Sequence, residues 1–323
     1  MIDNTGRSID YLRISITDRC NLRCVYCMPE DGMPNLTHTD ILRYEEFLRL
    51  VRVMTGLGVR HVRVTGGEPM ARRGCLDFIR ELHSIPGIET ISMTTNALLL
   101  DGRVDEAADA GLDALNISMD TLHPQRFAAM TRGGDVTRVL RVIRDALRRG
   151  LRVKINAVPV RGMNDGDLVD LARLAQHDPV HVRFIELMPV GFGAKLEPIP
   201  SDEVLSQLRA AFGELTPDTE KHGFGPARYV KPQGFAGSLG VISPMSHEFC
   251  DACNRVRLTS EGYLKLCLNH TAGADLRAML RSGCGDEELT RTIRDAIAHK
   301  PNRHGFDTVV DDRENKAMNE IGG

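Results

Sequence analysis

Residues 11–27 read YLRISITDRCNLRCVYC, a short β-strand pattern that runs directly into three closely spaced cysteines. Apolar residues alternate with polar ones along 11–17, and Arg13 is one of the polar ones. Successive side chains of a strand point to opposite faces. The stretch therefore predicts a strand with one apolar and one polar face, followed at its carboxyl end by a loop of thiols.

The same alternation recurs through the first two-thirds of the chain. Further strands are predicted over residues 61–65, 91–95, 114–118, 153–158 and 182–187. Helical periodicity fills the intervals, over residues 43–54, 75–83, 136–149, 165–176 and 201–212. Strands that alternate with helices indicate a parallel sheet with crossover helices.

The polar strand faces distinguish two α/β architectures. An open doubly wound sheet is covered by helices on both sides, and its strands are usually apolar throughout. Here polar residues such as Arg63, Thr94, Ser118 and Lys154 run along the strands, as expected for a lumen that binds a polar ligand. We therefore predict an α/β fold, a partial (βα)6 TIM-like barrel that is open where a complete barrel has eight strands.

The pattern changes after residue 212. Residues 213–244 are rich in Pro and Gly, and clear helical periodicity returns only near 286–300. We predict a barrel over residues 1–212 and a C-terminal extension over 213–323 that has little core of its own and packs on the barrel.

Composition excludes several classes of protein. The chain has 323 residues, 42% of them hydrophobic, which suffices for a large core. With a net charge of −3 and no basic run, it does not resemble a general nucleic-acid binder. No stretch approaches the ~20 apolar residues of a membrane span, and the first residues, MIDN, lack a secretory signal. A cytoplasmic location is expected.

Eight cysteines in a reducing compartment need an explanation other than disulfides. Cys75 and Cys284 stand alone, and we interpret them as packing residues. The other six form two triplets, which are Cys20, Cys24 and Cys27, and Cys250, Cys253 and Cys267. Clustered thiols of this kind indicate metal ligands.

The first triplet has the spacing of an iron–sulfur site. A cubic 4Fe–4S cluster normally takes four thiolates, so three would leave one iron open to a ligand. Zinc is the alternative, but zinc favours four protein ligands, and no fourth Cys or His lies close in the sequence.

The Cys-x3-Cys-x2-Cys spacing, with Tyr26 before the last cysteine, resembles the signature of radical S-adenosylmethionine (SAM) enzymes. GGEP at residues 66–69, after the second strand, resembles the SAM-binding motif of that superfamily. The resemblance implies that SAM chelates the open iron and is cleaved to a 5′-deoxyadenosyl radical. Two adjacent glycines agree with this, because glycine lets a backbone approach a ligand closely.

By itself the second triplet fits either an auxiliary cluster or a zinc ribbon, with His247, His270 or Cys284 as a fourth zinc ligand. Its surroundings favour the cluster. Residues 244–259, PMSHEFCDACNRVRLT, and the terminal Gly322-Gly323 are similar to the MoaA family of GTP 3′,8-cyclases. The resemblance spans most of the chain, and it implies a second 4Fe–4S cluster whose open iron binds the purine of GTP.

The resemblance also implies the reaction, the first step of molybdopterin (molybdenum cofactor) biosynthesis, catalysed by a lyase. The radical takes a hydrogen from the ribose C3′ of GTP, and C3′ then joins C8 to give 3′,8-cyclo-7,8-dihydro-GTP. Expected partners are a single-electron donor such as flavodoxin or ferredoxin and, downstream, cyclic pyranopterin monophosphate synthase. A monomer or a homodimer is expected.

The site residues implied by the resemblance fall into three sets. Those expected to contact GTP are Arg13, Arg63, Thr94, Lys154, Arg255, Val256 and Arg257. Those expected to contact SAM are Tyr26, Gly67, Ser118 and Met188. Gly322 and Gly323 are expected to enter the lumen and assist cyclisation, while Arg183, out of phase with Met188, stays unassigned. Two rival functions are a peptide-modifying radical SAM enzyme and a barrel fused to a zinc-ribbon binding module.

Overall fold

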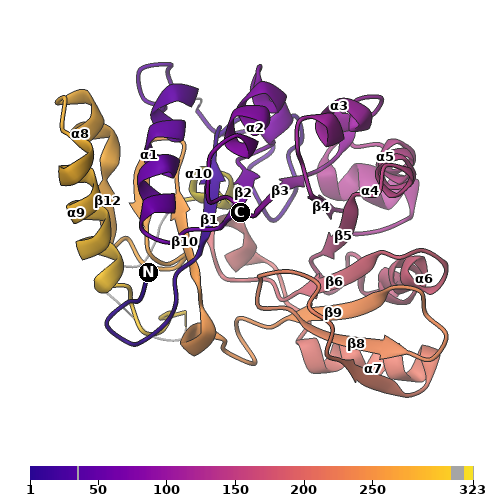
Figure 1. The fold of residues 1–323 in the computed structure, drawn as a ribbon. Helices are drawn as coiled ribbons and strands as arrows, with labels where there is room; N and C mark the ends of the chain where they lie inside the picture. Colours follow the sequence, from indigo (N-terminus) through magenta and orange to yellow (C-terminus); the bar gives the residue numbers. More distant parts are fainter. Residues whose placement is uncertain (35, 307–315, 323) are drawn as a thin grey trace.

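The computed structural model describes residues 1–34, 36–306 and 316–322. Its centre is a run of six parallel strands in chain order (Figure 1). They are β1 (Tyr11–Ser15), β2 (His61–Thr65), β3 (Thr90–Thr95), β4 (Ala114–Ser118), β5 (Arg152–Ala157) and β6 (His181–Ile185). All six predicted strands are present, with ends that shift by at most two residues.

Helices connect these strands and cover one face of the sheet. They are α1 (Tyr44–Gly56), α2 (Cys75–His83), α3 (Val104–Asp109), α4 (Pro124–Thr131), α5 (Val136–Arg148), α6 (Leu168–His177) and α7 (Ser201–Phe212). The sequence did not predict α3 and α4, which are only six and eight residues long. Helices this short offer too few turns for a clear periodic signal.

Helix α5 shows why the strongest pattern folded as expected. Its apolar residues fall on one buried stripe, which includes Val139, Val142 and Ala146. The side chain of Asp135 caps the first turn by accepting a hydrogen bond from the backbone of Thr137 at 2.9 Å. The helix ends just before Gly150, whose φ of 72° lies in the left-handed region.

One face of the strands is apolar and the other is polar, as predicted. The apolar residues lie in the hydrophobic core between strands and helices, and Leu12, Val64, Met93, Ile117 and Ile155 have 0% exposure. The polar residues of the same strands point to the other side, where a cavity lies. The predicted partial barrel is therefore confirmed.

The C-terminal third extends the sheet at both edges. Its strands are β7 (Leu215–Asp218), β8 (Arg228–Pro232), β9 (Ser238–Ile242), β10 (Arg255–Leu258), β11 (Tyr263–Lys265) and β12 (Gly273–Asp275). Strand β9 pairs in parallel with β6, and β10 pairs in parallel with β1. The order β12-β11-β10-β1-β2-β3-β4-β5-β6-β9-β8-β7 forms one open sheet. Residues 213–323 therefore build barrel wall as well as packing on it, while the boundary at 212/213 stays a prediction.

Three further helices complete the chain, namely α8 (Leu276–Arg281), α9 (Asp286–Ala298) and α10 (Met318–Ile321). Helices α8 and α9 lie beside α1 (Figure 1). Arg49 joins the two parts, since its Nε lies 2.8 Å from the carboxylate of Asp286 and its Nη2 donates to the backbone carbonyl of Cys284. Among the helices of the described residues, none has both the length and the apolar character to cross a membrane.

Candidate functional site

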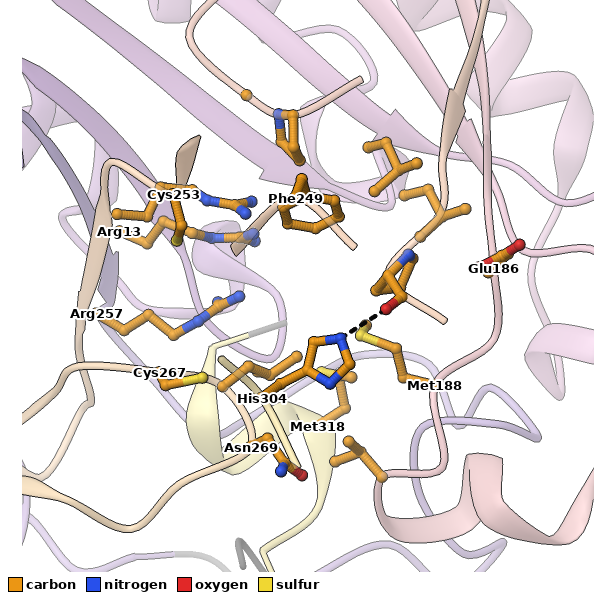
Figure 2. A pocket seen from close by; sticks show the side chains of 18 of the residues that line it. Arg13, Glu186, Met188, Phe249, Cys253, Arg257, Cys267, Asn269, His304 and Met318 are labelled. Atoms are coloured by element: carbon orange, nitrogen blue, oxygen red, sulfur yellow. Dashed lines mark hydrogen bonds between the residues drawn. The ribbon is translucent and has the colours of Figure 1, made fainter. Parts of the chain in front are cut away.

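One cavity of about 280 Å³ lies on the polar side of the sheet. Figure 2 shows Arg13, Arg257, Cys253 and Cys267 on one side of it and Met188 on the opposite side. Most residues expected at the site line this cavity, namely Arg13, Arg63, Thr94, Arg255, Arg257, Tyr26, Ser118, Met188, Cys250, Cys253 and Cys267. Residues assigned to SAM and residues assigned to GTP thus face a single space.

The second triplet opens directly into the cavity. Cys250 and Cys253 flank a short 3-10 turn before β10, and Cys267 follows β11. Burial raises the pKa of Cys250. Burial also acts to raise the pKa of Cys253, but the charges of Arg255 and Lys300 and hydrogen bonds from Arg255 outweigh it, leaving the pKa at about 7. Cys253 is therefore suited to be a thiolate ligand near neutral pH.

The first triplet lies on a loop that the barrel holds in place. The loop backbone bonds to α4, where Val25 donates to the carbonyl of Met130 at 3.0 Å. Tyr26 donates to the carboxylate of Asp120 at 2.7 Å. Burial raises the pKa of Cys24 well above its usual value, and the charges of Cys27 and Cys20 raise it further, so the three thiols lie close enough to interact.

The glycine pair in GGEP makes room for this loop. A Cβ on Gly66 would lie 2.6 Å from the carbonyl oxygen of Thr17, and a Cβ on Gly67 would lie 2.4 Å from that of Arg19. No side chain fits at these distances. Gly67 does not line the cavity. Gly67 thus approaches the chain segment that leads into the first triplet. The sequence could not distinguish this packing role from contact with SAM.

The geometry of the thiols favours iron–sulfur clusters over single zinc ions. Four ligands about 2.3 Å from a tetrahedral zinc lie only about 3.8 Å apart. Among the described residues, the groups with three ligand atoms within 4.8 Å of one another are Glu248, Cys250 and His304, and Asp218, Glu220 and His222. Cys250 of the second triplet belongs to the first of these groups, but neither triplet as a whole is among them. Wider spacing is expected when each thiolate binds a different iron of one cube.

The proposed fourth zinc ligands are engaged elsewhere. His247 faces Asp202 at 3.9 Å. The ring of His270 hydrogen-bonds the backbone carbonyl of Arg303 at 3.0 Å. Cys284 lies between α8 and α9, where its carbonyl accepts from Arg49. None of these three contacts places a ligand at the second triplet.

The cations of the cavity are close to one another. Burial lowers the pKa of Arg13 well below its usual value, and the neighbouring charges of Arg257 and Arg63 lower it further. Burial and the charge of Arg255 lower the pKa of Arg257 to about 10. Positive charges that lower one another's pKa in this way favour the binding of an anion between them.

Two residues assigned to GTP do not line the cavity. Val256 has 0% exposure in the hydrophobic core, because it lies on the opposite face of β10 from Arg255 and Arg257. The predicted contact of Val256 with GTP would therefore have to come from its backbone. Lys154 faces the lumen but is 5% exposed, and a Cβ on Gly223 would lie 2.3 Å from its Nζ.

Arg183 belongs to the cavity, although the sequence left it unassigned. Its Nη2 donates to Oδ1 of Asn116 at 2.7 Å, and its Nε donates to Oδ1 of Asn156 at 2.9 Å. Strand β6 ends at Ile185, so the alternation that set Arg183 out of phase with Met188 does not continue to Met188. Both residues line the cavity.

Two other cavity residues carried no signal in the sequence. Glu186 accepts hydrogen bonds from the backbones of Ser201, Met245 and Ser246, and so holds the segment before the second triplet. Asn269 is 1% exposed, and its Nδ2 has no hydrogen-bond partner among the described residues. An unpaired buried donor in a cavity is expected where a ligand supplies the acceptor.

The C-terminal residues reach into the barrel. Ile321 is fully buried against Val190 and Phe306. Gly322 has a φ of 75°, lies against Ser15, and accepts a hydrogen bond from Nη1 of Arg257 at 2.7 Å. Gly322 thus contacts an arginine of the cavity, its entry into the lumen stays a prediction, and Gly323 lies outside the described residues.

The comparisons with known proteins cover the whole chain. Residues 14–175 match the model of the radical SAM superfamily, and residues 180–306 match that of the Molybdenum Cofactor Synthesis C family. Relatives named GTP 3′,8-cyclase are 45% identical in Pelotomaculum thermopropionicum and 42% identical in Clostridium perfringens, over all of this chain and all of each relative.

A solved structure confirms the fold alone. Streptococcus suis SuiB bound to S-adenosylmethionine superposes with a TM-score of 0.63 at 16% identity, over 91% of this chain and 68% of SuiB.

Proposed function

The chain belongs to the GTP 3′,8-cyclase family of radical SAM enzymes, and on this premise we propose how its residues perform that reaction. The activity is the conversion of GTP to 3′,8-cyclo-7,8-dihydro-GTP in the first step of molybdenum cofactor biosynthesis. The observation that carries the assignment of roles is the single cavity, which joins a group of buried cations, an open cysteine triplet and the residues assigned to SAM.

The two triplets are the binding sites of two 4Fe–4S clusters. When bound, the first cluster and SAM supply a 5′-deoxyadenosyl radical that abstracts the C3′ hydrogen of GTP. The fit rests on the donor set, which is three free thiols in each group. The second triplet faces the cavity, and a cluster held there would bind the purine of GTP.

Arg13, Arg63, Arg183, Arg255 and Arg257 form the triphosphate cradle. Their guanidinium groups gather on the polar face of β1, β2, β6 and β10, where their mutual repulsion is relieved when phosphate oxygens bind. Guanidinium forks match phosphate oxygens and give charge-assisted hydrogen bonds. A protein of net charge −3 thereby binds a highly charged anion.

Tyr26, Ser118 and Met188 hold SAM at the other part of the cavity. The hydroxyl of Tyr26 is oriented by Asp120, which in turn accepts from the backbone of Val158 at 2.8 Å. This chain of hydrogen bonds fixes the ring beside the loop of the first triplet. Fixed groups keep the reacting atoms in position. The cavity also limits the access of water to a reactive radical.

The C-terminal tail lies between the first triplet and the arginine cradle. The backbone of Asn319 hydrogen-bonds the thiol of Cys27, and Gly322 bonds Arg257. The C-terminus therefore touches both the first triplet and the cradle. In this position Gly322 would confine the substrate after hydrogen abstraction and favour attack of C3′ on C8, and the same role is proposed for Gly323.

The peptide-modifying alternative has no observation in its favour. The likeness to SuiB at 16% identity shows the fold alone. Five arginines around one cavity suit a polyphosphate better than a peptide. A single-electron donor such as flavodoxin or ferredoxin, a downstream cyclic pyranopterin monophosphate synthase and a cytoplasmic location complete the proposal.

The deciding experiment is anaerobic reconstitution followed by incubation with GTP, SAM and dithionite. We expect about eight irons per chain if both clusters are cubes, and formation of the cyclised nucleotide. Cys24→Ala should abolish SAM cleavage, whereas Cys253→Ala should halve the iron and stop cyclisation. Zinc in place of iron at the second triplet would overturn the two-cluster assignment.

A further inference from the structure

Lys300 is a buried cation next to the second triplet. It follows α9, is 5% exposed, and lines the same cavity as Cys253 and Cys267. Its Nζ donates a hydrogen bond to the backbone carbonyl of Leu266, the residue before Cys267. The ammonium group is therefore held at the base of the triplet and away from solvent.

Such burial needs compensation, because an ammonium group loses its hydration when it leaves water. Burial lowers the pKa of Lys300, and the thiolate charges of Cys253 and Cys267 oppose this effect. The carbonyl of Leu266 compensates part of this loss of hydration, and an anionic cluster at the second triplet would compensate more.

Arg7 fixes the backbone that carries Lys300. Its guanidinium donates to four carbonyls, those of Cys250 at 3.0 Å, Asn302 at 3.2 Å, Lys300 at 3.1 Å and Pro301 at 2.9 Å. Its Nε donates to Asp3 at 2.7 Å, which orients the fork. Arg7 and Asp3 are both buried. One side chain thereby ties the turn at 300–302 to a residue of the second triplet.

We propose that Lys300 sets the electrostatic potential at the second triplet and that Arg7 is the positioning residue that holds Lys300 there. This inference rests on the proposed function, in which the triplet carries an iron–sulfur cluster. Reduction adds a negative charge to a cluster, so a nearby cation stabilises the reduced form and raises the midpoint potential.

The test is a redox titration of the second cluster, followed by electron paramagnetic resonance. The full chain carries Cys20→Ala, Cys24→Ala and Cys27→Ala, so that only the second cluster contributes to the signal. We expect Lys300→Met to lower the ratio of reduced to oxidised cluster about tenfold at a fixed potential, which is about 59 mV for one electron. Circular dichroism and iron content check that the variant is folded and loaded.

Lys231→Met is the matched control, because Lys231 is only partly buried, does not line the cavity, and its Nζ also donates to a carbonyl, that of Ala236 at 3.4 Å. It should leave the potential unchanged. A Lys300→Met potential equal to that of the control would refute the role of Lys300. If the parent chain instead binds no iron at the second triplet, the proposed function itself fails, and the two failures are distinguishable.

A double-mutant cycle tests the link between the two residues. Lysine at position 7 keeps the charge but not the planar fork, so Arg7→Lys should release the turn and lower the potential in the same direction. In the Lys300→Met background, Arg7→Lys should add almost nothing. An equal shift in both backgrounds would show that Arg7 acts without Lys300.

Discussion

Lys154 should make GTP binding depend on pH. Burial lowers its pKa to about 6, and the charges of Arg183, Arg63 and Arg152 contribute to the shift. At pH 7.5 the free enzyme would then hold Lys154 only about 3% protonated. Phosphate groups bound at Arg63 and Arg183 favour the charged form, so binding of GTP should take up nearly one proton.

The sign and size of the pH effect on GTP affinity follow from this linkage. Below pH 6 Lys154 is already charged, and binding gains nothing more from acidification. Above pH 6 each pH unit costs up to a factor of ten in affinity, which is about 1.4 kcal/mol. Between pH 6 and pH 7.5 the loss is therefore about 2 kcal/mol at most. Lys154→Met should remove this part of the pH dependence.

Isothermal titration calorimetry of GTP, without SAM or reductant, measures both quantities. Two buffers with different ionisation enthalpies report the protons taken up, and a series from pH 6 to pH 8.5 reports the affinity. Protonation of GTP itself is common to all variants, so the difference between parent and Lys154→Met isolates the lysine. Equal proton uptake in the parent and in Lys154→Met would refute the reasoning, and Lys231→Met should behave as the parent does.

Three further predictions concern the cradle, the tail and the first loop. Arg257→Ala should weaken GTP binding by about 1.5–3 kcal/mol, the range for a hydrogen bond to a charged group, and should leave SAM binding intact; equal loss of both affinities would contradict the cradle. Deleting Gly322 and Gly323 should preserve iron content and reduce cyclised product sharply, and normal yield would make the tail dispensable. Gly67→Ala should destabilise the loop of the first triplet by about 1–3 kcal/mol through overpacking and lower its iron content, because the new Cβ would meet a carbonyl at 2.4 Å. Gly56→Ala, which meets nothing within 4 Å, is its control.

Local patterns in the sequence determined the barrel and most of the site. The period-two alternation placed Arg13, Arg63, Thr94 and Ser118 on the lumen side, because side-chain direction along a strand depends only on local backbone geometry. By the same rule the side chain of Val256, between Arg255 and Arg257, faces the core. The cysteine spacings identified the metal sites for an equally local reason, since each loop holds most of its own ligands.

The alternation rule failed where the strand ended. The alternation in the sequence put Arg183 and Met188 on opposite faces. Strand β6 ends at Ile185, however, and both residues line the cavity. Strand ends depend on which neighbours are present to pair, and β9, the partner of β6, comes from more than fifty residues farther along the chain. The predicted role of the glycine pair in GGEP was incomplete for a similar reason, because its contact is with another loop.

Only the tertiary structure decided which distant segments meet. Strand β10 pairs with β1 and so brings the second triplet to the cavity on the polar side of the sheet. Gly322 reaches Arg257, and Arg7 reaches Cys250 and Lys300 across more than 240 residues of sequence. These contacts depend on how whole helices and strands pack together, and local periodicity in the sequence does not predict that packing. The sequence by itself thus determined the kinds of ligand and their chemistry, and the fold determined that the second triplet, the arginines and Met188 share one cavity.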